Sequence, residues 1–352
     1  MKITQKSFGV TSKGEEATLF TIQNSSGMTV SFTNYGANIV SIIVPDSKGN
    51  FTDICLGFDN IQGYEENTLG LGSLIGRHAN RIGGAKFTID GKEYELEKNE
   101  ADNNLHSGFV GYNKFMYETE IFEEEEMISI EFSRLSPHME QGFPGNLDVS
   151  VTYSLTEGNE LMIEYHAVPD QATVINLTNH CYFNLAGHNS GSILDHKVWL
   201  KSNKYTPTRE DLIPTGEILD VAGTPMDFRI LKRVGQDIDA DFEQLNIAGG
   251  YDHNYALDIS GDQVEKVAEL VEEKSGRVME VFTDRPGIQL YSGNFMTPVA
   301  NSKDGAVYEK RYGICFETQF FPDSVNNPSF PSCVFKAGEV FESVTIYKFS
   351  CR

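Results

Sequence analysis

The chain has 352 residues, among them 23 Phe, 15 Tyr, 32 Gly and a single Trp. This length is enough for one large all-β domain or two ordinary domains, and the aromatic and glycine content favours strands and turns. The formal charge of −23 argues against nucleic acid and anionic membranes as partners, because their phosphates would be repelled, and it also disfavours a phosphorylated substrate.

Apolar and polar residues alternate along most of the chain, which is typical of strands with one wet face. An Asp-Gly pair marks one hairpin turn, and a Thr-Glu-Gly-Asn turn marks another. In chain order, we expect a short helical turn around 60–67, a hairpin over 87–96, a strand 147–155 with its hairpin partner 161–165, a helical turn around 230–245, and a strand 340–349 that closes a sheet.

Residues 262–283 allow two interpretations. The apolar residues between 262 and 273 fit helical spacing, and those between them are good helix formers. However, Lys274, Ser275 and Gly276 form a turn signal, and 277–283 alternates clearly. We favour a long hairpin over a helix.

Nothing in the sequence divides the chain into parts. There is no Pro- or Ser-rich linker, no internal repeat and no abrupt change of composition, and turn signals recur about every 8–12 residues, as in sandwiches and barrels. Four acidic residues at 123–126 are expected to form a solvated loop or strand edge. We therefore expect a single domain over 1–352.

The cysteines and the N-terminus indicate where the protein works. Five cysteines are widely spaced and form no C-x-x-C pair, so we expect free thiols in a reducing compartment. The N-terminus lacks the apolar stretch of a secretion signal, and no apolar run approaches bilayer length. We therefore expect a cytoplasmic protein that does not enter a membrane.

Two distant strand-like segments carry groups suited to proton transfer. His180 lies in a stretch that is unusually polar for a half-buried strand, which indicates a hydrogen-bond network or a ligand cleft. Glu317 lies between Phe316 and a Phe-Phe pair, and an apolar setting raises the pKa of a carboxyl group towards neutrality. The two residues are a candidate general acid and general base on opposite sides of one polar small molecule.

Other polar residues are weak signals taken singly. Arg77 and Arg81 offer fork-shaped donors, and a Gln on a well-patterned strand suits sugar-like hydroxyls. No metal-ligand spacing, nucleophile elbow, P-loop or dinucleotide fingerprint is present. We therefore expect chemistry from His, Glu, Asp and Arg alone, with no metal and no cofactor.

Six short polar motifs are spread over nearly the whole chain, at 76–82, 104–106, 176–185, 251–254, 286–294 and 316–322. Together they resemble the motifs of the aldose 1-epimerase (galactose mutarotase) family and occur in that family's order. The turn at 142–147 also resembles a family turn, whereas His78 and Cys181 are residue types not expected at their positions, and we interpret both as packing.

The resemblance implies a large antiparallel β-supersandwich, galactose mutarotase-like, with a few short helical turns and an open polar cleft. It also implies interconversion of the α and β anomers of free hexoses such as galactose and glucose, by a monomer or a homodimer. Glu317 would be the general base and His180 the general acid. The residues implied to hold the sugar hydroxyls are Asn80, Arg81, His106, Tyr182, Asp252 and Gln289.

Three other functions remain as alternatives. A sugar-phosphate mutarotase would need further Arg or Lys residues in the cleft, and we find no basic cluster beyond Arg77 and Arg81. A glycoside hydrolase would use two carboxylates, for which Asp252 and Glu317 are candidates. A non-catalytic sugar-binding module would not need both His180 and Glu317.

Overall fold

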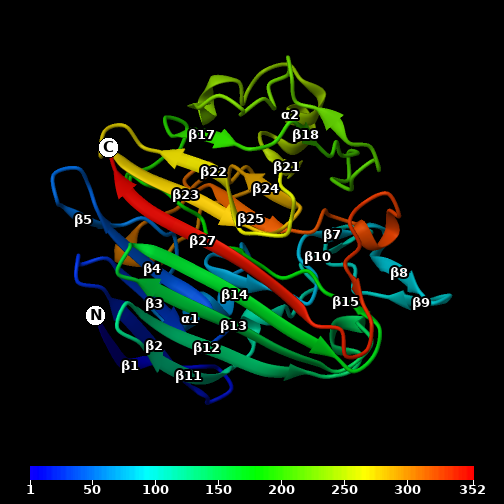
Figure 1. Ribbon diagram of the computed structural model, residues 1–352, viewed down its shortest axis with the longest axis horizontal. Coiled ribbons are helices and arrows are strands. Elements are labelled where there is room, and N and C mark those ends of the chain that lie inside the picture. Colours follow the sequence, from blue (N-terminus) through cyan, green and yellow to red (C-terminus); the bar gives the residue numbers. More distant parts are fainter.

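The computed structural model describes all residues, 1–352, and is built almost entirely from antiparallel strands (Figure 1). The largest sheet has nine strands. Its order is β11 (Glu118–Glu123), β12 (Met127–Ser136), β13 (Leu147–Thr156), β14 (Glu160–Pro169), β27 (Phe341–Cys351), β23 (Arg277–Thr283), β22 (Glu265–Val271), β17 (Lys197–Leu200) and β20 (Lys232–Arg233).

Two five-stranded sheets accompany the large one. The first consists of β1 (Lys2–Val10), β2 (Glu16–Gln23), β3 (Thr29–Thr33), β4 (Asn38–Pro45) and β5 (Phe51–Asp53), in chain order. The second has the order β19 (Leu219–Asp220), β18 (Lys204–Tyr205), β21 (Asp252–Ala256), β24 (Gly287–Tyr291) and β25 (Cys315–Gln319).

Short strand pairs and helices complete the fold. The pairs are β10 (Asn104–Leu105) with β7 (Arg81–Ile82), β15 (Thr173–Val174) with β26 (Val334–Phe335), β16 (Thr178–His180) with β6 (Ser73–Ile75), and β8 (Lys86–Ile89) with β9 (Lys92–Glu95). The α-helices are α1 (Ile61–Glu66) and α2 (Glu243–Ala248), and neither has the length or apolar character needed to cross a membrane. These elements confirm the all-β prediction.

The predicted local elements agree with the structure. Strands β8 and β9 form the hairpin expected over 87–96, and β13 pairs with β14 as expected. The ambiguous segment 262–283 is the hairpin of β22 and β23, so its helical spacing of apolar residues did not decide the structure. Helix α1 lies within the turn predicted around 60–67, whereas α2 overlaps only the end of the one predicted around 230–245, where a short 3-10 turn also spans 234–236. The acidic run 123–126 is exposed.

Strand β27 lies in the middle of the large sheet, where it pairs with β14 on one side and β23 on the other. Figure 1 shows this red strand between green β14 and yellow β23. The sequence predicts this strand and its role in closing a sheet, but not its central position. Its alternating pattern shows one wet face, but alternation alone does not tell an edge strand from a central one.

The sheets pack face to face around one main apolar core. Phe32 of β3 stacks on Tyr153 of β13 with ring centroids 4.8 Å apart, which joins the first five-stranded sheet to the large sheet. Tyr347 of β27 donates a hydrogen bond to the Phe316 carbonyl of β25, which joins the second five-stranded sheet to the same layer. Because Phe316 and Thr318 face this core, their neighbours Cys315, Glu317 and Gln319 point to the opposite face of β25.

Candidate active site

A cleft of about 670 Å³ opens on the face of β25 that points away from the core. Seven of the eight site residues expected from the sequence line it. They are Asn80, Arg81, His106, His180, Tyr182, Asp252 and Glu317. Residues up to 237 positions apart in the chain, Asn80 and Glu317, therefore meet around one volume, which requires the non-local pairing of an all-β fold.

Register across three strands sets the floor of this cleft. Gln289 of β24 lies opposite Glu317 of β25, and Tyr291 of β24 lies opposite Asp252 of β21. Since residues i and i+2 of a strand share a face, Gln289 and Tyr291 lie on the same side of β24 as their cross-strand partners. Two carboxylates, an amide and a phenol are thus held at fixed positions by backbone hydrogen bonds.

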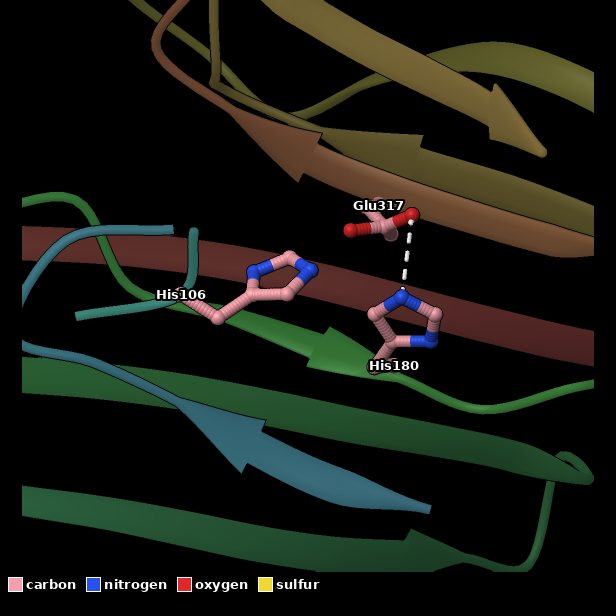
Figure 2. A group of neighbouring side chains, drawn as sticks. All are labelled: His106, His180 and Glu317. Atoms are coloured by element: carbon pink, nitrogen blue, oxygen red, sulfur yellow. Dashed lines mark ion pairs between the residues drawn. The ribbon is translucent and has the colours of Figure 1, made fainter. Parts of the chain in front are cut away.

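The side chains of His180 and Glu317, which both line the cleft, point toward each other (Figure 2). His180 Nε2 lies 3.5 Å from Glu317 Oε1, and the two residues are 5% and 2% exposed. Burial raises the pKa of Glu317 well above its ordinary value, and the nearby charge of Asp252 adds to the rise. Burial lowers the pKa of His180 to about 4. Both shifts favour uncharged side chains at these buried positions.

His106 approaches the pair from the loop after β10 (Figure 2). Its Nδ1 accepts a hydrogen bond from the Asn80 backbone N–H at 3.1 Å, so the neutral ring carries its proton on Nε2. Burial lowers the pKa of His106 well below its ordinary value, which keeps the ring neutral. Asn80 and His106 have φ values of 62° and 50°, a strained conformation that is concentrated at functional sites.

Arg81 is fixed by two carboxylates. Its Nε and Nη2 donate to the two oxygens of Glu100 at 2.6 and 2.8 Å, and its Nη1 lies 3.8 Å from Asp252 Oδ2. The bidentate pair with Glu100 fixes the plane of the guanidinium. Glu100 also lines the cleft, and no sequence pattern indicates its role, because only the fold brings it beside Arg81.

Gln289 and Tyr182 make protein contacts that the sequence did not reveal. Gln289 does not line the cleft; its Nε2 donates to Asp252 Oδ1 at 2.7 Å and holds that carboxylate in place. The Tyr182 hydroxyl donates to the Leu69 carbonyl at 2.9 Å, and its ring lies 5.0 Å from the ring of His180. The Tyr182 oxygen keeps lone pairs that can accept from a sugar hydroxyl.

Arg77, which the sequence offered as a second fork-shaped donor, is fully buried away from the cleft. Its Nη1 donates to the carbonyls of Pro144 and Gly145 at 2.8 and 3.0 Å, so it braces the turn at 142–147. His78 and Cys181 are also buried, at 0% and 1% exposure, in agreement with packing.

His106, His180 and Glu317 come close enough together for their ligand atoms to surround a cation. The hydrogen bond from Asn80 to His106 Nδ1 opposes such binding, because it leaves an N–H rather than a lone pair on Nε2. The three side chains therefore fit a ligand with hydroxyl groups better than a divalent metal.

Comparison with known proteins agrees with this geometry. The profile of the family described as aldose 1-epimerase matches residues 18–348. Human galactose mutarotase is 42% identical over 349 residues, covering 99% of this chain and 98% of its own. Aldose 1-epimerase of Escherichia coli K12 is 35% identical over 340 residues, covering 96% of each chain.

A solved structure shows the same fold over the same length. The galactose 1-epimerase of Lactobacillus acidophilus superimposes with a TM-score of 0.87 at 25% identity, covering 99% of both chains. The alignment therefore includes both halves of the large sheet and all the strands that line the cleft. The chain belongs to the aldose 1-epimerase family, a family of isomerases that interconvert the anomers of aldoses.

Proposed function

We propose that this protein interconverts the α and β anomers of free hexoses such as galactose and glucose, with Glu317 as general base and His180 as general acid. The observation that carries the proposal is the 3.5 Å approach of His180 Nε2 to Glu317 Oε1 in the wall of a cleft of about 670 Å³. Opening a hemiacetal ring requires one proton removed and one delivered, which is what this pair provides.

The proposed reaction begins with Glu317 ionised and His180 protonated. Glu317 takes the proton of the anomeric hydroxyl, the C1–O5 bond breaks, and His180 Nε2 delivers its proton to the ring oxygen. The product is the open-chain aldehyde beside a neutral acid and a neutral imidazole. Rotation about C1–C2 presents the other face of the carbonyl, and the two proton transfers then run in reverse to close the other anomer.

The pKa shifts of the pair support this direction of proton transfer. Burial raises the pKa of Glu317 and lowers that of His180, so the uncharged pair is favoured over the ion pair. The uncharged pair is the state that accompanies the open-chain aldehyde. Opening the ring therefore relieves the cost of keeping two charges in a buried site.

The other cleft residues suit a neutral polyol. Arg81, His106 and Asp252 present donors and acceptors from three different elements, and we propose that they and Asn80 hold the hydroxyls while Tyr182 packs beside them. Gln289 would act through Asp252. The two cations of the cleft are already engaged: Arg81 with Glu100 and Asp252, and Lys114 with backbone carbonyls at the end of α1. This arrangement disfavours a sugar phosphate.

Polarimetry of freshly dissolved α-D-galactose and α-D-glucose tests the proposal. We expect the purified protein to speed the approach to the equilibrium rotation of both sugars, and the rate to be unchanged after dialysis against a chelator, because no step needs a metal. A rate that disappears on dialysis and returns with a divalent cation would contradict the proposed mechanism.

Two control substrates separate the alternatives. Glucose 6-phosphate should react much more slowly than glucose, because the cleft has no free cation for the phosphate; equal or faster reaction would favour a sugar-phosphate mutarotase. An aryl galactoside should release no sugar, whereas release would favour a hydrolase that uses Asp252 and Glu317. Sugar binding without any change in the mutarotation rate would favour a binding module.

The pH dependence of kcat should show a broad plateau, because the reaction needs one proton shared by the pair. The acid limb comes from adding a second proton, and since the pKa of His180 is lowered to about 4, this limb should lie well below pH 6.5. The alkaline limb comes from loss of the shared proton, and the raised pKa of Glu317 moves it upward. An acid limb near pH 6.5 would mean that His180 titrates like an exposed histidine.

We further propose that residues 1–352 act as a single domain, as a monomer or homodimer in the cytoplasm. The pairing of β27 with strands from both halves of the chain supports one domain. The cysteines support a reducing compartment: all five are free, including Cys55 and Cys181, whose sulfurs lie 3.6 Å apart.

A further inference from the structure

Strand β25 contacts both ring nitrogens of His180. Glu317 Oε1 lies 3.5 Å from Nε2, and Cys315 Sγ lies 3.6 Å from Nδ1. Cys315 and Glu317 are two residues apart, so they point to the same face of the strand. One strand therefore holds the base and a second polar atom at opposite ends of the same imidazole.

The direction of the Cys315 hydrogen bond follows from the proposed role of His180. A protonated imidazole has an N–H on both nitrogens, so Nδ1 donates and Sγ accepts. After Nε2 has delivered its proton to the ring oxygen, the proton that remains on the neutral ring is the one on Nδ1. The same Nδ1–H···Sγ contact thus persists through ring opening and ring closure.

We infer that Cys315 is a positioning residue for the mutarotase reaction, whose sulfur accepts the Nδ1–H of His180 and keeps Nε2 directed at the ring oxygen of the sugar. This inference rests on the proposed role of His180 and adds a residue that none of the sequence motifs singled out. Tyr182, Tyr291 and His106 enclose the ring, at centroid distances of 5.0, 6.3 and 5.3 Å.

The aromatic rings around His180 do not by themselves determine which of two orientations its imidazole takes, whereas the contact with Cys315 does. Turning the imidazole by 180° within the same aromatic surroundings would exchange each nitrogen with a carbon. Only the observed orientation places a ring nitrogen against both Cys315 and Glu317. The flipped ring would place C–H groups against the thiol and the carboxylate and leave a buried N–H without an acceptor, which is costly.

At Nδ1 of a histidine that acts as a general acid, a thiol is a better acceptor than a carboxylate. A carboxylate at this position is typical of a histidine that acts as a general base. A carboxylate at Nδ1 would stabilise the imidazolium and make His180 reluctant to release its proton. Burial, followed by the charges of Glu317 and Asp252, raises the pKa of Cys315 well above its ordinary value, so the sulfur stays an uncharged thiol. An uncharged acceptor orients the ring without holding its proton.

Three variants and one control test the inference. Cys315→Ala removes the acceptor and should lower kcat for α-D-galactose by roughly tenfold, with KM within about twofold, as expected for loss of a buried hydrogen-bond partner. Cys315→Ser keeps an acceptor and should retain most of the wild-type kcat. Cys315→Asp should shift the acid limb of the kcat profile to higher pH. The control, Cys333→Ala, removes a buried thiol in a different apolar cluster and should leave kcat unchanged.

A second measurement separates this inference from the proposed function. In protein labelled with 15N histidine, the His180 ring signals should change in Cys315→Ala and be close to wild type in Cys315→Ser, whether or not the protein is a mutarotase. The inference is overturned if Cys315→Ala keeps both the wild-type kcat and the wild-type ring signals. It is also overturned if the folded Cys315→Ser protein is as impaired as Cys315→Ala, because the sulfur would then act by packing alone.

Discussion

Glu317→Gln should lower kcat by about 10²–10⁴-fold, the scale of a positioned base. The amide keeps the shape of the side chain and one oxygen near His180 Nε2, but it cannot take the proton of the anomeric hydroxyl. KM should change little, because Arg81, His106 and Asp252 still present the same groups to the sugar. Mutarotation followed by polarimetry at saturating galactose gives kcat directly.

The fold should tolerate this change. Burial raises the pKa of Glu317 in the folded protein above its unfolded value, so its ionisation costs stability as pH rises from the unfolded pKa towards the folded one. Glutamine does not ionise and escapes this cost. We expect the variant to melt at no lower temperature than the wild type at neutral pH. Glu342→Gln, at an exposed position of β27, is the matched control and should keep full activity. A near-wild-type kcat in the folded Glu317→Gln variant would contradict the proposal that Glu317 is the general base.

His180→Asn should lower kcat on the same scale, about 10²–10⁴-fold, because no group then delivers a proton to the ring oxygen. Asparagine keeps a polar side chain in the cleft wall but has no proton to release near neutrality. The residual activity should also lose the acid limb of the kcat profile. His166→Asn, at an exposed position of β14, is the matched control and should behave as wild type.

The double variant tests whether the two groups act together. If Glu317 and His180 move their protons in one step, losing either already removes most of the benefit of the other. The double variant should therefore be far more active than the product of the two single losses predicts. Losses that simply multiply would show that the residues act in separate steps.

The sequence was most informative where function constrains residue type. His180 and Glu317 lie in motifs with a recognisable order, and seven of the eight expected site residues line one cleft. The hairpin over 262–283 was predicted correctly because a turn signal and a clear alternation outweighed helical spacing. Both signals are patterns of residue type and order along the chain, and neither needs a contact between distant strands to be recognised.

What the sequence did not reveal depends on contacts between distant strands. The facing of Cys315 and His180 depends on how β16 lies beside β25, and no pattern within either strand specifies it. Arg81 and Glu100 meet only when the loops around β7 and β10 fold together. Gln289 was expected to face a sugar, but its side chain donates to Asp252 and does not line the cleft.

The central place of β27 has a consequence for the order of folding. Residues 341–351 follow β14 by more than 170 positions and β23 by more than 50, yet they complete the ladder between these two strands. Until they arrive, both neighbours present an unpaired edge, which is a template for pairing with another chain. β27 also supports the strand that carries Glu317, through the hydrogen bond from Tyr347 to the Phe316 carbonyl. The placement of β25 and the continuity of the large sheet thus depend on the same pairing, so folding should be slow, of high contact order, and most exposed to aggregation before β27 has paired.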